Sequence, residues 1–131
     1  MSARILLKRN PLKLAACRRG AGALEFALVV PAFFVMVVGG IYCAAMVFTV
    51  ASMHYAVEAG ARCASVQTAV CADAPSTVAY TQAHFFSPSG TPTFTYSATG
   101  CGHTVTGTVT YVFDMGLTKS NVPLSASACF P

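Results

Sequence analysis

One carboxylate lies near the start of a long apolar run, where its chemistry differs from that of an exposed acid. The stretch CRRGAGALEFALVVP, residues 17–31, passes from two arginines into apolar residues and carries Glu25 among them. A charge in a medium of low dielectric constant is costly unless it is paired, protonated or able to reach the interface. Glu25 is therefore either an interfacial residue or one that pairs with a cation.

Cysteines form the second set of reactive side chains, and they divide by position. Cys17 lies in a basic tail and Cys43 in the apolar run, whereas the other four lie in the polar half that follows. Four cysteines in a small domain outside a membrane predict two disulfides, with three possible pairings. Closeness in sequence favours Cys63 with Cys71, which leaves Cys101 with Cys129. That second pair needs a twist or bulge, because Cys129 should face away from Leu124 on its strand.

No set of side chains is typical of catalysis or metal binding. The three histidines are scattered, no C-x-x-C occurs, and no glycine-rich phosphate loop follows an expected strand. Four acidic residues are too few for a hydrolase with paired carboxylates, and Asp73 and Asp114 fit cap and turn positions. The sequence predicts no catalytic residue, no metal site, no cofactor and no enzymatic activity.

The positive charge is confined to one end of the chain. The first twenty residues contain six of the eight Lys and Arg and no acid, so the net charge of +4 describes a tail on a nearly neutral body. Nucleic-acid binding is therefore not expected. Only 9% of the residues are charged and 55% are hydrophobic, which is typical of a membrane protein.

The element that must position Glu25 is a membrane-spanning helix. No charged residue occurs from Phe26 to Met53, and a helix of that length would measure about 42 Å against a hydrocarbon core of about 30 Å. Basic residues before the run place the N-terminus in the cytoplasm. We expect a cytoplasmic leader at 1–20, a helix in the lipid bilayer at 21–53 and an exported domain at 54–131. Pro31 should kink or loosen the helix.

The exported part predicts an α+β fold. The helix should continue through MHYAVEAGARCASV, with Glu58 and Arg62 as an i,i+4 pair, and end near residues 66–70. A short second helix should follow, capped by Asp73 or Ser76, with Val78, Ala79, Gln82, Phe85 and Phe86 roughly on one face. The segments PTFTYSAT, TVTGTVTYVF and VPLSASACF alternate apolar and polar residues and predict a small antiparallel sheet packed on the exported end of the long helix.

The spacing around Glu25 resembles that of a type IV prepilin. Gly20, four residues, Glu25 and Phe26 follow a basic segment and precede a long apolar run. The resemblance implies that a prepilin peptidase cuts between Gly20 and Ala21 on the cytoplasmic side. The new amine of Ala21, with an ordinary pKa near 8, would be cationic. Glu25 of one subunit would then pair with that amine of a neighbour and set the register of the assembly.

A wider resemblance extends over residues 20–131. GAGALEFALVVPAFF, AVEAGARCASV and the ending LSASACFP are similar to the TadE-like pseudopilins of the tight-adherence (Tad) pilus system. The resemblance implies a minor pilin that initiates, caps or anchors an adhesive pilus. Its partners would be the prepilin peptidase, other pilins and pseudopilins, and the inner-membrane assembly platform. It would lie in the bacterial inner membrane with its C-terminal domain in the periplasm, and would be incorporated into an extracellular pilus.

Two other interpretations remain open at this point. The chain could be a single-pass, signal-anchored envelope protein with a disulfide-stapled binding domain outside the membrane. It could also be a secreted module with a cleaved signal, since Ala44 and Ala45 imitate a cleavage site, although the apolar run is about twice the usual length. The mature N-terminus separates the three.

Overall fold

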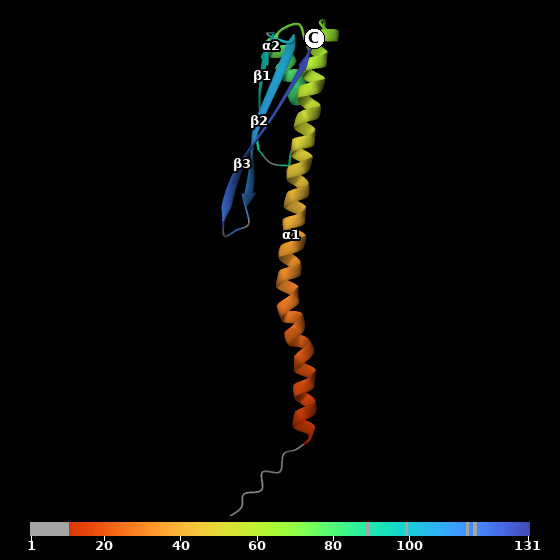
Figure 1. The fold of residues 1–131 in the computed structure, drawn as a ribbon, viewed down its shortest axis with the longest axis vertical. Coiled ribbons are helices and arrows are strands. Elements are labelled where there is room, and N and C mark those ends of the chain that lie inside the picture. The colour runs from red at the N-terminus through yellow and green to blue at the C-terminus, as the bar shows by residue number, and fades with distance from the viewer. Residues whose placement is uncertain (1–10, 89, 99, 115, 117) are drawn as a thin grey trace, which may run out of the picture. The chain divides into compact units, whose positions relative to one another are not determined.

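A computed structural model describes residues 11–88, 90–98, 100–114, 116 and 118–131, with the backbone alone for 11–19 and 21. The first ten residues of the predicted leader lie outside this part. The chain divides into two compact units, Met1–Gly40 and Ile41–Pro131. Helix α1 (Pro11–Val66) includes residues of both units (Figure 1).

In the first unit, α1 is an apolar helix with its side chains in the open. Among the large apolar residues, Leu24, Phe26 and Met36 are 66%, 71% and 78% exposed. The stretch Gly22–Val66 is long and apolar enough to cross a membrane. Pro31 lies within the helix and does not end it, because the backbone can lose one hydrogen bond while its neighbours are kept. Whether the helix yields at Pro31 remains a prediction.

The second unit contains the remainder of the fold. Helix α2 (Ala74–Ala83) begins at an N-cap, Asp73, with Pro75 in its first turn. Asp73 Oδ1 accepts a hydrogen bond from the backbone N–H of Ser76, and Ser76 Oγ accepts one from the Asp73 N–H, at 2.9 and 3.1 Å. This reciprocal capping satisfies backbone donors that the first turn of a helix leaves free.

The fully buried residues of α2 are not among those that the sequence grouped on one face. Thr77 and Thr81 are fully buried, whereas Ala79 and Gln82 are exposed. Each buried threonine returns its hydroxyl to the carbonyl one turn earlier, Thr77 to Asp73 and Thr81 to Thr77, at 2.8 Å each. The polar atom is thereby satisfied within its own helix, and the small side chain is free to pack.

Three antiparallel strands form one sheet in the order β1 (Thr93–Ser97), β2 (His103–Asp114), β3 (Lys119–Phe130). Val105, Val109 and Tyr111 of β2 are buried and alternate with more exposed threonines. This alternation produces one apolar face toward α1 and one wet face, as the sequence predicts. Pro123 is tolerated because β3 is an edge strand.

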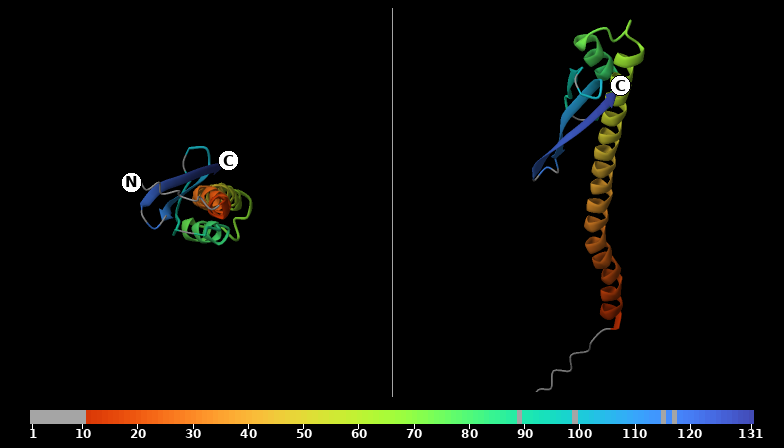
Figure 2. Two further views of the ribbon diagram at one scale, coloured as in Figure 1. Left: turned by 90° about the horizontal axis from the view of Figure 1, so that it is seen from below. Right: turned by 45° about the horizontal axis from the view of Figure 1, so that its top comes forward.

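The core lies where α1, α2 and the inner face of the sheet meet (Figure 2). Met53, Ala56 and Val57 of α1 contact Val105 and other sheet residues there. Small residues on α1 let α2 approach closely, most clearly at Gly60. The predicted α+β architecture, with the sheet packed on the end of the long helix, is confirmed.

Two hydrogen bonds tie opposite ends of the sheet to α1. Tyr42 Oη donates to the carbonyl of Asp114 at 2.7 Å, and Ser65 Oγ donates to the carbonyl of Pro131 at 2.8 Å. The lengths agree, since β2 measures about 40 Å and the helix between Tyr42 and Ser65 about 35 Å. The strand pair β2–β3 therefore runs alongside α1 for most of its second-unit length, as Figure 1 shows.

The expected i,i+4 ion pair on α1 is absent. Among the residues that the structure describes, the salt bridge found joins Lys119 to Asp114 at 2.9 Å, and Glu58 and Arg62 do not form one. Both side chains are exposed, so water competes with the pairing and little free energy would be gained.

Candidate functional site

The residues of the predicted prepilin motif all lie on one exposed helical segment of the first unit. Gly20, Glu25 and Phe26 are exposed, and no atom outside the local helix backbone lies within 4 Å of a Cβ built at Gly20. Ala21 is helical, and its side chain is not described. Residues 21 and 25 are four apart, so they lie on one side of the helix, about one turn from each other.

The structure offers Glu25 no cationic partner within the part of the chain that it describes. The carboxylate therefore projects from an apolar helix, and any group that surrounds it belongs to lipid, to another subunit or to residues that the structure does not describe. This is consistent with either an interfacial residue or one that pairs with another subunit.

An aromatic cluster at the start of the second unit was not predicted. The ring of Tyr42 lies 5.9 Å from that of Phe113, which lies 4.9 Å from that of Tyr111. Tyr111 Oη also donates to the carbonyl of Tyr42 at 3.4 Å. The cluster holds the end of β2 against α1. A signal was present, because Tyr111 and Phe113 share a strand face, but nothing in the sequence located Tyr42 opposite them.

The loop after α2 is fixed to α1 by two hydroxyl groups. Thr49, which is fully buried, donates to the carbonyl of Ala45 at 2.9 Å and lies 3.2 Å from Ser87 Oγ. Ser52 Oγ accepts a hydrogen bond from the backbone N–H of Phe86 at 2.7 Å. Polar residues inside the apolar run thus mark the part of α1 that contacts the protein's own domain.

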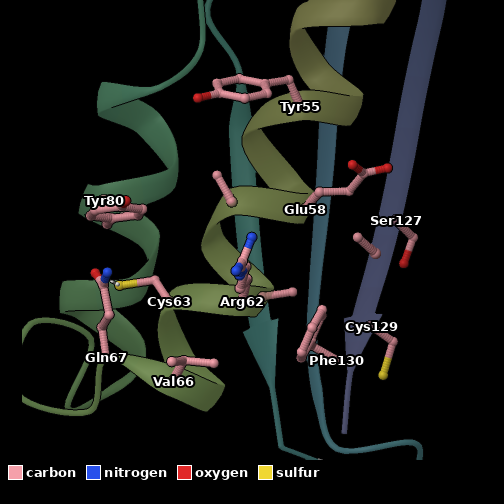
Figure 3. Close-up of a pocket in the computed structure, with 13 residues that line it drawn as sticks. Tyr55, Glu58, Arg62, Cys63, Val66, Gln67, Tyr80, Ser127, Cys129 and Phe130 are labelled. Atoms are coloured by element: carbon pink, nitrogen blue, oxygen red, sulfur yellow. Dashed lines mark hydrogen bonds between the residues drawn. The ribbon is translucent and has the colours of Figure 1, made fainter.

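An open pocket of about 780 Å³ lies over the exposed side of α1, between α2 and the end of β3 (Figure 3). Glu58 and Arg62 project from the helix into it, flanked by Tyr80 of α2 and Phe130 of β3. Among the residues that line the pocket, Glu58 is the one carboxylate, so the lining provides no pair of facing acids.

Both disulfides lie in the second unit. Cys63 and Cys71 are joined and almost fully buried, which ties the end of α1 to the loop before α2. Cys101 and Cys129 are joined on the outer, exposed face of the sheet. Thr104 still pairs with Cys129 in an unbroken ladder. Of the twist or bulge expected for this pair, the bulge is absent from the described ladder, because Cys101 precedes β2 and reaches the outer face from its own turn.

The far end of the β2–β3 hairpin carries the ion pair. The Lys119 ammonium, which bonds to the carboxylate, and the N–H of Gly116 together hold the pKa of Asp114 below its usual value.

Cys43 is a free, exposed thiol one residue beyond Tyr42. In the described part of the chain, no group of three or more His, Cys, Asp or Glu could hold a metal ion.

Comparison with known proteins links one region to a family. Residues 20–62 match the model of the family described as TadE-like protein. The match begins at the glycine of the prepilin motif and ends at Arg62. Over these residues it confirms the resemblance, and it supports a TadE-like protein of the Tad pilus system. Proteins of this pilin family are structural. The apolar N-terminal helix of the present chain fits a membrane-anchored pilin. No curated protein and no solved structure matched the chain.

Proposed function

We propose that this TadE-like protein is a minor pilin, or pseudopilin, that a prepilin peptidase cuts between Gly20 and Ala21. The observation that carries the proposal is the exposed Glu25, one helical turn beyond Ala21, on a segment that matches the TadE-like family from residue 20. The mature subunit takes part in assembly of a Tad-type adhesive pilus, at its start, tip or base.

The chemistry of the mature end explains the position of the glutamate. Cleavage creates an amine at Ala21 that is mostly cationic at neutral pH. The amine and the Glu25 carboxylate lie on one side of the helix, so two neighbouring helices can each present a cation to the other's anion. In a medium of low dielectric constant such a pair is tolerated where an unpaired charge is not. The pairing therefore sets the axial register more than it adds stability.

Cleavage is tested by the mass and N-terminal sequence of the chain from cells with and without the peptidase. We expect the chain to begin at Ala21 only when the peptidase is present. Gly20→Val should abolish the cut. Gly22→Val is the matched control, because both glycines lie on the exposed helix with open space around them. A chain that begins at Met1 or Ser2 in peptidase-containing cells would support the signal-anchored envelope protein instead.

The role of Glu25 is tested by co-purification with other pilins from membranes. Glu25→Ala should strongly reduce the amount recovered, whereas Glu58→Ala should not. Glu58 is an exposed glutamate on the same helix, in the second unit. Wild-type processing and wild-type recovery of the Glu25→Ala chain would refute the pairing.

A further inference from the structure

Only part of the apolar run of α1 lacks contacts with the sheet and α2, and that part is shorter than the whole run. From Tyr42 onward, α1 carries the contacts of the second unit: Tyr42 bonds to Asp114, Thr49 is fully buried and Met53 belongs to the core. Before Tyr42, the stretch Gly22–Ile41 is exposed apart from two half-buried positions, Val30 and Gly39. Its length is about 30 Å, which equals the hydrocarbon thickness of a bilayer.

We propose that the outer edge of the hydrocarbon core lies at Tyr42, about a dozen residues before the end of the apolar run, and that the hairpin end of β2–β3 rests on the phospholipid interface there. The contact is made by the half-buried rings of Tyr42 and Phe113 and by the exposed Val112, and the buried Tyr111 supports these rings from inside. It concerns the membrane-embedded chain, and it does not depend on cleavage or on pilus assembly.

The composition of this end of the domain suits the interface between lipid and water. Tyrosine and phenylalanine gather there, and aromatic rings favour the headgroup level of a membrane. Val112, on the outer side of β2, is 39% exposed. The described residues between the two strands, Gly116 and Thr118, carry no charge. Lys119 and Asp114 neutralise each other by their salt bridge, so approach to the bilayer does not require an unpaired charge to lose water.

The rest of the second unit agrees with a position above the interface. Thr49 and Ser52 use their hydroxyls to fix the loop after α2, whose backbone groups would be costly to place in hydrocarbon. A boundary at Met53 would draw this loop and the middle of the sheet into the bilayer. A boundary at Tyr42 leaves both in water or among headgroups.

The absence of tryptophan from the sequence makes the boundary measurable. Four Phe→Trp variants of the full chain, each with a single tryptophan, are reconstituted at a high ratio of lipid to protein. The vesicles contain phosphatidylethanolamine and phosphatidylglycerol, with lipids brominated on the acyl chain as quenchers. The four positions are Phe34 on the free helix, Phe113 in the cluster, Phe48 on the exposed side of the covered helix, and Phe130 at the other end of the sheet.

We expect quenching by brominated lipid to fall in the order Phe34→Trp, Phe113→Trp, Phe48→Trp. Phe130→Trp should be quenched least, and Phe113→Trp should be quenched at least about twofold more than Phe130→Trp. Acrylamide, a quencher dissolved in water, should give the reverse order. Thermal unfolding of each variant shows that the exchange has left the domain intact.

Two results would overturn the proposal. Quenching of Phe48→Trp by lipid as strong as that of Phe113→Trp would place the boundary near Met53. Quenching of Phe113→Trp no stronger than that of Phe130→Trp would mean that the hairpin end does not touch lipid. The fluorescence of Phe113→Trp is also measured at a low ratio of lipid to protein. If both quenchers lose their effect only there, a second copy of the chain covers this surface, and contact with the membrane is refuted.

Discussion

Gly60 of α1 lies directly against Thr81 of α2, so that a Cβ at position 60 would overlap the Thr81 hydroxyl oxygen. The Thr81 Cβ itself would be only 3.2 Å from the added atom. Both residues are buried, and the Thr81 hydroxyl is already bonded to the Thr77 carbonyl. The two helices therefore meet at a point where one has no side chain and the other has a small one held in place.

Gly60→Ala should destabilise the second unit by about 1–3 kcal/mol, as overpacking of a close contact usually does. The gain in helix propensity, about 1 kcal/mol, offsets part of the clash. The measurement is thermal or denaturant unfolding of the detergent-solubilised chain. Gly40→Ala is the matched control on the same helix, since a Cβ there meets nothing within 4 Å. Adding Thr81→Ala should restore part of the loss, and a Gly60→Ala chain as stable as the parent would contradict the contact.

Gly107 in the middle of β2 has a similar role on the sheet side of the core. A Cβ at this position would lie 2.6 Å from the Phe94 ring and 3.3 Å from Val57 Cγ1. Gly107→Ala should therefore cost about 1–3 kcal/mol in the free energy of unfolding. Phe94→Leu removes the ring and should recover part of that cost in the double variant, measured by a double-mutant cycle. Additive effects of the two substitutions would show that the ring and Gly107 do not interact.

Local patterns were sufficient to predict the elements of this fold. The uncharged run predicted the long helix, the cap signal at Asp73 predicted the second, and period-two alternation predicted the inward residues Val105, Val109 and Tyr111. These features depend on neighbours in the chain, which the sequence displays directly.

Features that depend on distant partners were missed or misjudged. Apolar periodicity does not reveal the buried threonines of α2, because Thr81 packs against Gly60 and its hydroxyl is bonded within its own helix. The bond from Tyr42 to Asp114 joins positions 72 residues apart. It depends on the length of the hairpin relative to the helix, which no local pattern encodes. The expected limit of the membrane-spanning helix at residue 53 rests on charge alone and stays a prediction.

The two disulfides should differ in how readily they are reduced. Cys63 and Cys71 are 3% and 4% exposed, whereas Cys101 and Cys129 are both exposed. A thiolate must reach a sulfur atom to attack it. Brief treatment with dithiothreitol, followed by alkylation and peptide mass analysis, should open Cys101–Cys129 first. Faster opening of Cys63–Cys71 would mean that the end of α1 is less closely packed than the structure has it.

Loss of either disulfide should also lower the free energy of unfolding, and the physical cause differs between the two. Cys101→Ser with Cys129→Ser releases a loop worth about 3–4 kcal/mol of chain entropy. Cys63→Ala with Cys71→Ala releases a shorter loop, worth about 2.5 kcal/mol on the same basis, but also leaves a buried site less well filled. Unfolding in denaturant measures both double variants against the parent. A loss well below about 1 kcal/mol for either pair would contradict the covalent link in the folded chain.

The N-cap of α2 should make stability depend on pH at the acid end. The Ser76 hydroxyl, and then the Ser76 N–H, hold the pKa of Asp73 below its ordinary value of 3.8 in the folded chain. Above that value Asp73 is ionised whether the chain is folded or not, so its contribution is complete. As the pH falls below 3.8, the unfolded chain binds the proton first, and the contribution is lost until the pH passes the lowered folded pKa.

Asp73→Asn keeps an acceptor for the Ser76 N–H but cannot titrate, so it should flatten this part of the curve of stability against pH. Asp73→Ala removes the acceptor and should lower the melting temperature at neutral pH as well. Asp114 also has a lowered pKa, but it is present in the parent and in both variants, so the difference between their curves isolates Asp73. Melting temperatures from pH 7 down to the acid limit provide the measurement. Parallel curves for the parent and Asp73→Asn would show that the carboxylate charge does not support the cap.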